Sequence, residues 1–234
     1  MKEFSNLYIL GFTSALVLFV AAALSFTSLT LKPQQHMNVE IERQQNILTA
    51  LGIKSTSKDI AEKYNQYIKQ SIVIKTNGDI VDGESAERIN LKKENEKPVE
   101  DRLYPLYFAE KDGLTFIVIP LSGAGMWGPI WGNMVVENDM NTIYGATFDH
   151  KRETPGLGAE INTPAFGQQF HGKMLFDKSD VFTCVKVKKP GSYMSNEHTV
   201  DAISGGTITC DGLEKMLETC IKPYQTYLLQ HKPK

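Results

Sequence analysis

Several patterns that mark metal or nucleic-acid sites are missing from this chain of 234 residues. Its three cysteines, Cys184, Cys210 and Cys220, form no Cys-x-x-Cys pair, and its five histidines include no His-x-x-x-His pair. Zinc and iron–sulfur sites usually depend on such closely spaced ligands. The net charge is −2 and no basic run occurs, so nothing points to nucleic acid. We expect no metal site and no nucleic-acid partner. The cysteine spacing favours free, partly buried thiols and leaves a disulfide open.

Charge is also absent from a long run near the amino terminus. No charged residue occurs from Phe4 to Leu31, and a helix of this length and composition can span a bilayer. Tyr8 suits one membrane interface, and Lys32-Pro33 closes the other end. A cleaved signal peptide is the alternative, because Ala21-Ala22-Ala23 resembles a cleavage region, but the uncharged run is longer than a typical apolar signal core. We expect a retained anchor over residues 1–33, whose orientation the flanking charges barely decide.

Residues 34–110 change from helical to strand patterning. Gln34–Gly52 and Ser57–Ile68 carry apolar residues at helical spacing, and Gly52 suits a helix end. Ser71–Val81 has strand patterning around the turn Asn77-Gly78-Asp79, which predicts a hairpin. Ala86–Arg102 is mostly charged and predicts a solvated linker or edge. We expect this segment to pack on the remainder of the chain.

Residues 111–234 carry the patterns of an antiparallel sheet. Leu114–Ile119, Met134–Val136 and Ile143–Phe148 are short apolar runs that predict strands. Ser122–Gly132 is rich in glycine and contains both tryptophans, Trp127 and Trp131, so we predict a loop there. Its indoles either fill a core between layers or form a wall against a flat ring system.

The last part of the chain predicts one more strand and a closing helix. Asp180–Lys188 alternates in polarity, which places Lys186 and Lys188 on one face, more often a solvated face than a site. The helix is predicted to begin at Asp211 with a capping box to Glu214, and to kink or divide at Pro223. The predicted fold is α+β: one transmembrane helix (1–33), a helical and β segment (34–110), and a domain with a twisted antiparallel sheet flanked by helices (111–234).

The polar stretch Asp201–Thr209 is the best candidate for a site. Ser204, Thr207 and Thr209 supply hydroxyl groups beside the pair Gly205-Gly206. Two glycines before a helix let several backbone N–H groups converge on one point, and the positive end of the helix dipole adds to them. Such a turn suits a phosphate, although most stretches of this composition are ordinary surface turns.

This stretch resembles the flavinylation motif Asp-x-x-Ser/Thr-Gly-Ala-Thr. In that motif the last threonine carries FMN through a phosphoester bond, which a dedicated flavin transferase makes. Asp201, Ser204, Gly205 and Thr207 match the motif, and Gly206 replaces its alanine. Upstream, Glu153-Thr-Pro-Gly-Leu-Gly-Ala-Glu160 contains the Pro-Gly pair of a type II turn.

The order of these features is similar to that in one family. An apolar amino-terminal run, Trp127-Gly-Pro-Ile-Trp-Gly132, Glu153-Thr-Pro-Gly-Leu-Gly158 and the flavin motif before a terminal helix resemble the C subunit of the sodium-translocating NADH:quinone oxidoreductase of bacterial membranes. The similarity covers most of the chain and is strongest from Gly123 to Gly212. The G subunit of the Rnf ferredoxin:NAD complex shares the flavin motif and is one alternative. A membrane-tethered binding or scaffold domain without redox chemistry is the other.

The resemblance implies a cofactor site. Thr207 would carry covalent FMN, with Thr209 and then Ser204 as the next candidates. Ser204 and Gly205 would contact the phosphate. The residues implied to contact the ring are Glu153, Thr154, Leu157 and Gly158, with Trp127, Lys186 and Lys188 as weaker candidates.

The resemblance also implies a cellular role. The domain would lie on the periplasmic side of the inner membrane, in contact with membrane lipid and with the other members of a complex of six subunits. Its flavin would relay single electrons during NADH-to-quinone electron transfer coupled to sodium export. We expect no complete active site and no NADH or quinone site on this chain, since we identify no Gly-x-Gly-x-x-Gly after a predicted strand.

Overall fold

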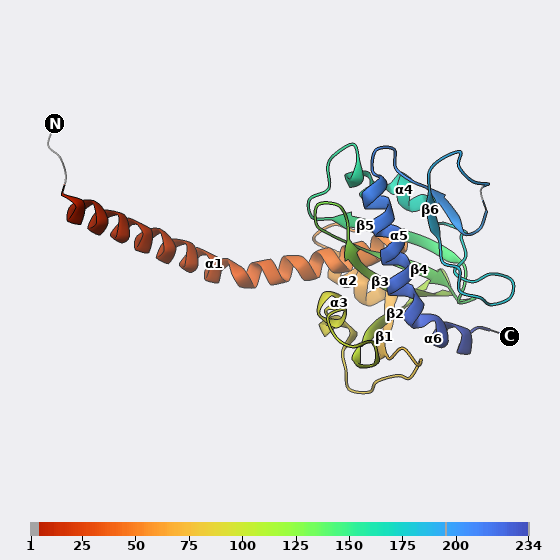
Figure 1. Cartoon of the computed structure of the whole chain (residues 1–234). Coiled ribbons are helices and arrows are strands. Elements are labelled where there is room, and N and C mark those ends of the chain that lie inside the picture. Colours follow the sequence, from red (N-terminus) through yellow and green to blue (C-terminus); the bar gives the residue numbers. More distant parts are fainter. Residues whose placement is uncertain (1–4, 195, 234) are drawn as a thin grey trace. The chain divides into compact units, whose positions relative to one another are not determined.

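The structure, a computed structural model, describes residues 5–194 and 196–233. The chain divides into two compact units, with the boundary between Arg43 and Gln44. One helix, α1 (Asn6–Ala50), begins in the first unit and ends in the second, which contains the strands and the other helices (Figure 1). The α+β class is confirmed, because a long apolar helix precedes a domain with an antiparallel sheet and helices. The finer division at residues 33 and 110 stays a prediction.

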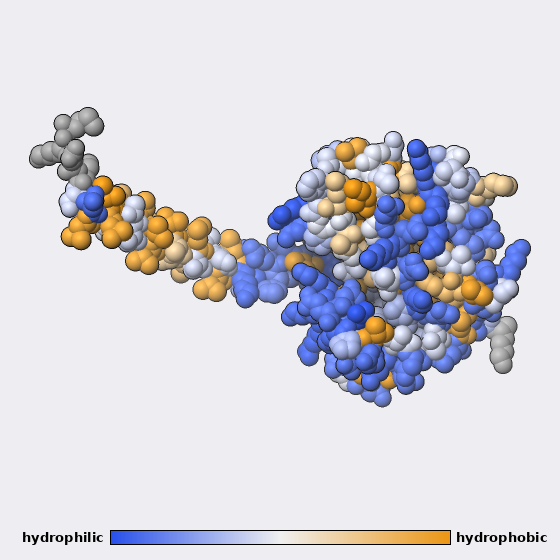
Figure 2. Space-filling model, viewed as in Figure 1, coloured by the Kyte–Doolittle hydropathy of each residue, from blue (hydrophilic) through white to orange (hydrophobic). Residues whose placement is uncertain are grey.

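Helix α1 passes through Pro33, where we expected the anchor helix to close. The end of the membrane span there stays a prediction, but the helix itself does not end: proline removes one N–H donor and crowds the preceding turn, and α1 nevertheless continues on both sides of Pro33. In the described part of the chain, α1 alone is long and apolar enough to cross a membrane. Its large apolar side chains from Leu7 to Leu31 are exposed, and Figure 2 shows them as a hydrophobic surface along the first part of the helix.

The second unit is built on a five-stranded sheet in the order β1-β2-β3-β4-β5. Each strand pairs antiparallel with its neighbour in the sequence, as a meander. The strands are β1 (Ile68–Ile74), β2 (Tyr104–Lys111), β3 (Leu114–Ala124), β4 (Pro129–Glu137) and β5 (Ile143–His150). The hairpin predicted over Ser71–Val81 is present as the end of β1 and a single bridge between Ile74 and Ile80.

The loop predicted over Ser122–Gly132 is wrong. Residues 122–124 extend β3, residues 129–132 begin β4, and the two segments pair across a four-residue turn. Gly132 is needed there, since a Cβ atom would lie 2.0 Å from the carbonyl oxygen of Thr147 on β5. The expectation that no Gly-x-Gly-x-x-Gly follows a strand is wrong, because residues 123–128 have this spacing at the end of β3, but they join two strands. The helix of a dinucleotide-binding loop is therefore missing.

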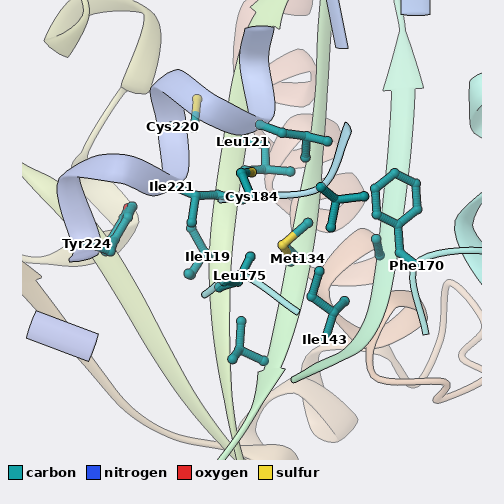
Figure 3. Packing of buried hydrophobic residues seen from close by; sticks show 14 of the residues in the cluster. Ile119, Leu121, Met134, Ile143, Phe170, Leu175, Cys184, Cys220, Ile221 and Tyr224 are labelled. Carbon is teal, nitrogen blue, oxygen red and sulfur yellow. The ribbon is translucent and has the colours of Figure 1, made fainter. Parts of the chain in front are cut away.

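The sheet buries apolar side chains on both faces. Helix α5 (Thr207–Ile221) packs against β3 on one face, where the main core lies (Figure 3). Ile119, Leu121 and Met134 of the sheet contribute to this core, together with Leu175, Cys184, Ile221 and Tyr224. The end of α1 lies over β5 on the other face, since the Thr147 hydroxyl donates to the carbonyl of Asn46 at 3.3 Å. The shorter helices are α2 (Ile60–Tyr67), α3 (Leu91–Glu94), α4 (Pro164–Gln168) and α6 (Gln225–Gln230).

The segment predicted as a solvated linker or edge, Ala86–Arg102, contains two buried residues, Ala86 and Glu94. The Glu94 side chain accepts hydrogen bonds from the Leu103 N–H at 3.0 Å and from Lys97 Nζ at 2.9 Å. Part of this segment is therefore fixed to the start of β2.

Two strands, β6 (Lys186–Lys188) and β7 (Thr199–Asp201), pair in parallel as a second sheet. The strand predicted over Asp180–Lys188 is thus wrong for its first six residues. Asp180 and Cys184 have φ values of 58° and 56°, outside the extended range. Cys184 is buried in the core, whereas a regular alternation would place it on the same face as Lys186 and Lys188.

The closing helix begins four residues earlier than predicted. Helix α5 starts at Thr207 with Gly206 as its N-cap, so Asp211 lies within the helix. Glu214, predicted to complete a capping box, instead accepts the Val187 N–H at 2.7 Å and forms ion pairs with Lys186 and Lys188. The predicted division at Pro223 is confirmed, because α5 ends at Ile221 and α6 follows.

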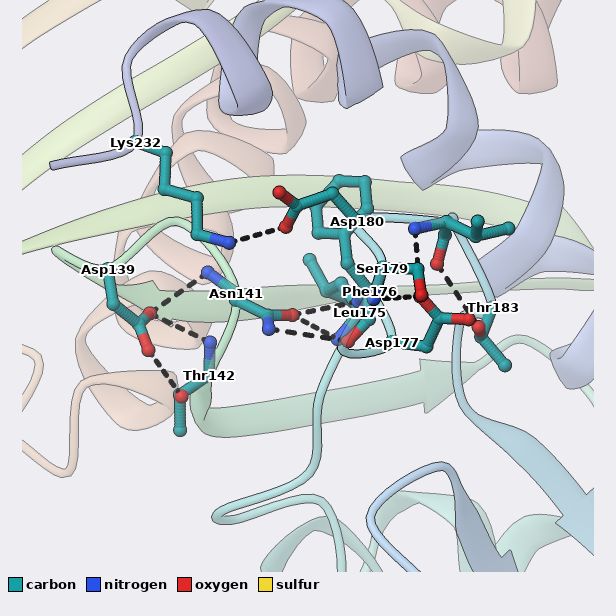
Figure 4. A network of polar contacts seen from close by, with 11 residues as sticks. Asp139, Asn141, Thr142, Leu175, Phe176, Asp177, Ser179, Asp180, Thr183 and Lys232 are labelled. Carbon is teal, nitrogen blue, oxygen red and sulfur yellow. Dashed lines mark hydrogen bonds and ion pairs between the residues drawn. The ribbon is translucent and has the colours of Figure 1, made fainter. Parts of the chain in front are cut away.

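A polar cluster around Asn141 connects the loop after β4 with the segment before β6 (Figure 4). The Oδ1 atom of Asn141 accepts the N–H groups of Leu175 and Phe176 at 3.0 and 2.8 Å. Asp139 accepts both N–H groups of residues 141 and 142 and the Thr142 hydroxyl. The cluster supplies partners for backbone groups that no sheet satisfies.

Candidate functional site

A cavity of about 380 Å³ lies where three separate segments meet. These segments are the β3–β4 turn, the turn that follows β5, and the first turn of α5 with the glycines before it. The lining residues are Met126, Trp127, Glu153, Thr154, Leu157, Gly158 and residues 205–209. We call this the α5 cavity.

The structure brings most of the predicted site residues to the α5 cavity. Thr207, Gly205, Glu153, Thr154, Leu157, Gly158 and Trp127 all line it. Ser204 does not: it lines a neighbouring cavity of about 660 Å³, together with Lys188 and Lys189. Gly205 and Thr207 line both cavities.

Lys186 lines neither of these two cavities, since its Nζ atom lies 3.8 Å from Glu214 and 3.3 Å from Glu218 on α5. Met126 and Ile208 line the α5 cavity but were missed by the sequence reasoning. Their position next to Trp127 and Thr207 was the available signal. A further cavity of about 320 Å³, between the end of α1, β5 and α4, contains none of the predicted site residues.

The turn before α5 depends on glycine. Gly205 has a φ of 75°, which favours glycine, and a Cβ atom there would lie 2.6 Å from Cδ2 of Leu157. The first hydrogen bond of the helix joins the Cys210 N–H to the Gly206 carbonyl at 2.9 Å. The N–H groups of residues 207–209 precede this bond and have no acceptor within the helix. Together with the helix dipole they can bind an anion.

The three candidate hydroxyl groups differ in their access to solvent. Thr207 and Ser204 are exposed. Thr209 is only 2 % exposed, and its hydroxyl donates to Oε2 of Glu153 at 2.5 Å. The hydroxyl of Thr207 is therefore the free one at the α5 cavity.

Glu153 is a buried carboxylate, with 5 % of its surface exposed. Its Oε1 atom accepts the backbone N–H of Trp127 at 2.8 Å, while Oε2 accepts from Thr209. Within residues 5–194 and 196–233, no lysine, arginine or histidine forms an ion pair with it. Hydrogen bonds alone hold this carboxylate.

Four apolar side chains surround the α5 cavity and face solvent. Met126 is 49 % exposed, Trp127 59 %, Leu157 41 % and Ile208 57 %. Exposed apolar groups gathered around a few polar ones are typical of a ligand site. The arrangement suits a flat apolar ring attached to an anionic group.

The cysteines offer no second site. All three are free and buried, so the disulfide left open by the sequence is absent among them. Burial raises the pKa of the Cys184 thiol to about 12, and it also raises the pKa of Cys210 and Cys220. In the described part of the chain, no three His, Cys, Asp or Glu residues gather as metal ligands.

Residues 125–222 match the family model of the FMN-binding domain. This range contains all the residues that line the α5 cavity. The residues present fit FMN, because the first turn of α5 offers N–H groups for a phosphate and the four exposed apolar side chains offer contacts for the ring. The close approach of Gly205 to Leu157 joins these two parts of the site.

Relatives match over most of the chain. The C subunit of the Na(+)-translocating NADH-quinone reductase from Vibrio vulnificus is 31 % identical over 221 residues, which covers 88 % of this chain and 86 % of the relative. The same protein from Haemophilus ducreyi is 32 % identical over 200 residues, covering 79 % and 77 %.

Solved structures agree with this. The crystal structure of the C subunit from Parabacteroides distasonis has a TM-score of 0.78 and 39 % identity, and covers 85 % of this chain and 96 % of that one. Shewanella oneidensis NqrC has a TM-score of 0.71 and 25 % identity, with coverage of 82 % and 97 %. The identity and the coverage together show that this chain belongs to the family formed by the C subunits of the Na(+)-translocating NADH-quinone reductases.

Proposed function

We propose that this chain is the flavoprotein C subunit of a sodium-translocating NADH-quinone reductase and carries FMN as a phosphoester on Thr207. The observation that carries the proposal is the place of Thr207. This exposed residue opens α5 at the edge of a cavity whose other walls are exposed apolar side chains. A phosphate on this hydroxyl lies at the helix start, where N–H groups and the helix dipole stabilise negative charge.

Two contrasts support Thr207 over the other hydroxyl groups. Thr209 is buried and donates its hydroxyl proton to Glu153, so a flavin transferase could reach it only after the turn opened. Ser204 is exposed but lines the neighbouring cavity, away from the apolar side chains. Thr207 alone of the three combines exposure with a place in the α5 cavity.

The residues of this chain bind and orient the cofactor, while the bound FMN supplies the single-electron chemistry. Gly205 and the first N–H groups of α5 hold the phosphate. Thr154, Leu157 and Gly158 line the opposite wall. Lys186 and Lys188 form ion pairs with glutamates of α5, which opposes a role for them at the ring.

The apolar part of α1 spans the inner membrane in this proposal, with the second unit on the periplasmic side. The partners are the other subunits of the complex, membrane lipid, and the flavin transferase that attaches FMN. The flavin relays electrons between redox centres while the whole complex transfers electrons from NADH to quinone and exports sodium. A flavin tethered outside the cytoplasm cannot be lost by dissociation.

The experiment is co-expression of the full chain with a flavin transferase, followed by intact-mass measurement and ultraviolet imaging of a denaturing gel. The native chain should carry one FMN. Thr207→Ala should carry none, whereas Thr207→Ser should keep the adduct, and so should the matched control Thr219→Ala, which changes an exposed threonine of α5 that does not line the α5 cavity. A native chain without added mass contradicts the function, and an adduct on Thr207→Ala contradicts the assignment of the residue.

A further inference from the structure

Glu153 connects two walls of the α5 cavity that lie far apart in the sequence. One carboxylate oxygen accepts the N–H of Trp127 in the β3–β4 turn, and the other accepts the hydroxyl of Thr209 in the first turn of α5. Neither oxygen is directed to the cavity as a free acceptor. The residue therefore bridges the walls and is poorly placed to contact the ring with its charge.

Two glycines make room for this carboxylate. A Cβ atom at Gly125 would lie 2.6 Å from Oε1 of Glu153, and one at Gly158 would lie 2.7 Å from Oε2. Real Cβ atoms do not approach other heavy atoms so closely, so any larger residue at either position would displace the carboxylate. One glycine belongs to the β3–β4 turn and the other to the turn after β5. The space that holds the carboxylate, its seat, is thus bounded by one glycine from each of the two turns.

A buried carboxylate without a cation is a costly way to join two segments. Removing a carboxylate from water costs several kcal/mol, of which hydrogen bonds return part. An apolar side chain of similar size would avoid that cost, but it would leave the Trp127 N–H and the Thr209 hydroxyl without an acceptor. The carboxylate provides directional hydrogen bonds, because its two oxygens hold one N–H and one O–H at defined positions.

We propose that Glu153 is a positioning residue for the flavin. It holds the Trp127 turn and the start of α5 at a fixed separation, so that the ring-binding site is formed before the cofactor is attached. It also keeps the Thr209 hydroxyl engaged, which leaves Thr207 as the accessible acceptor. The part concerning the ring depends on the proposed function, whereas the part concerning the cavity walls does not.

The first test uses the full chain without flavin. Hydrogen exchange is measured by mass spectrometry in peptides that contain Trp127 and the first turn of α5. Glu153→Ala should raise exchange in both peptides by about tenfold, since it removes two hydrogen bonds to a charged group. Glu153→Gln should restore most of the protection, because an amide can accept from Trp127 and donate to Thr209. The sheet peptides should be unchanged.

Glu160→Gln is the matched control. Glu160 lies on the same turn and accepts the Gly156 N–H at 3.0 Å, but it joins no second segment and does not line the α5 cavity. Hydrogen exchange of the Glu160→Gln variant in both peptides should equal that of the native chain. If Glu153→Ala fails to fold, Glu153→Asp replaces it, since a side chain shorter by one methylene cannot reach both donors.

The second test uses the flavinylated chains and measures the fluorescence anisotropy of the flavin. Glu153→Ala should give a lower anisotropy than native, while Glu153→Gln and Glu160→Gln should stay close to native. Exchange and anisotropy equal to those of the control would overturn the inference. A native chain that takes up no flavin would instead defeat the proposed function, and the exchange result on the flavin-free chain would still stand.

Discussion

Glu153 and Asn141 each tie together segments that are distant in the sequence, yet they do so in different surroundings. Asn141 Oδ1 accepts the backbone N–H groups of Leu175 and Phe176, and its Nδ2 donates to the Phe176 carbonyl at 3.3 Å. Its side-chain amide thereby gives the loop at residues 175–176 the backbone hydrogen bonds that a neighbouring strand would otherwise provide. Glu153 joins one backbone N–H and one hydroxyl whose residues both line a cavity.

We infer from this difference that the Asn141 cluster stabilises the fold, whereas the hydrogen bonds of Glu153 shape a binding site. Both clusters satisfy buried or half-buried polar groups, so hydrogen bonding alone does not distinguish them. The region around Glu153 differs because exposed apolar side chains and the accessible residue Thr207 lie beside it. Changes at Asn141 should therefore act on stability, and changes near Glu153 should act on the flavin.

The largest expected effect on stability is that of Asn141→Ala. It leaves the Phe176 N–H without its acceptor and removes the amide that donates to the Phe176 carbonyl, while the Leu175 N–H keeps the backbone carbonyl of residue 141 at 3.1 Å. The free energy of unfolding should fall by about 3 kcal/mol. Urea unfolding of the full chain measures it, with Asn138→Ala on the exposed neighbouring residue as the control. The variant that remains folded should still carry flavin. Loss of the adduct would contradict the claim that changes at Asn141 act on stability alone.

The next effect is that of Gly158→Ala, which tests the crowded seat of Glu153. The added methyl group would lie 2.3 Å from Oγ1 of Thr209, and overpacking of this kind costs about 1–3 kcal/mol. Flavin attachment should fall as well. Gly156→Ala is the control, because Gly156 has a φ of 75° but open space around it, so only backbone strain of about 1 kcal/mol is expected. Equal flavin yields for both variants would contradict the prediction.

A smaller effect should appear in acid, and part of it should come from the Asn141 region. Hydrogen bonds from the N–H groups of Val181 and Ser179 lower the pKa of Asp177. Burial raises the pKa of Asp139, but hydrogen bonds from Thr142 and Asn141 outweigh it, so the pKa is lowered. Carboxylates with a lowered pKa stabilise the fold above their unfolded-state pKa and lose that contribution as the pH falls through the folded value.

The free energy of unfolding should thus stay level from neutral pH to about pH 4 and decrease below it. Asp139→Asn should flatten this decrease by less than about 1 kcal/mol, since the group is partly exposed. Urea titrations at several pH values provide the measurement. An equally steep decrease in the variant would show that other carboxyl groups cause it.

The smallest effect concerns the cysteines. Only the thiolate reacts, and burial raises the pKa of all three thiols, that of Cys184 to about 12. Iodoacetamide at pH 8 should label the native chain at least about a hundredfold more slowly than the urea-unfolded chain, which takes three labels. Early labelling of Cys210, whose sulfur accepts the Ile203 N–H, would indicate that the turn before α5 opens readily.

The parts of the fold that follow from short apolar runs were predictable. The runs 114–119 and 143–148 are strands, and residues 116–119 are all buried because the sheet is covered on both faces. The pairing of residues 122–124 with 129–132 was not predictable, because glycines carry no side-chain pattern and backbone pairing decides the structure there. The turn at Cys184 likewise depends on contacts with the distant core.

The candidate site divides in the same way. Thr207 and the Glu153–Gly158 turn could be found from their motifs, and the structure places them on one cavity. The start of α5 was misplaced because the local capping signal of Asp211 and Glu214 competes with a tertiary role, in which Glu214 binds β6. The burial of Thr209 and the bridge through Glu153 join residues 56 positions apart, and no local pattern contains that information.

The seat of the Glu153 carboxylate limits how this protein can evolve. Residues 125, 153 and 158 pack against one another, and the space beside the two glycines is filled by the Glu153 carboxylate. A larger residue at either glycine requires a shorter one at 153, and a shorter one at 153 leaves a gap and two donors without an acceptor. A single substitution at any of these three positions is therefore unfavourable. Among homologues the three positions should change together or remain as they are.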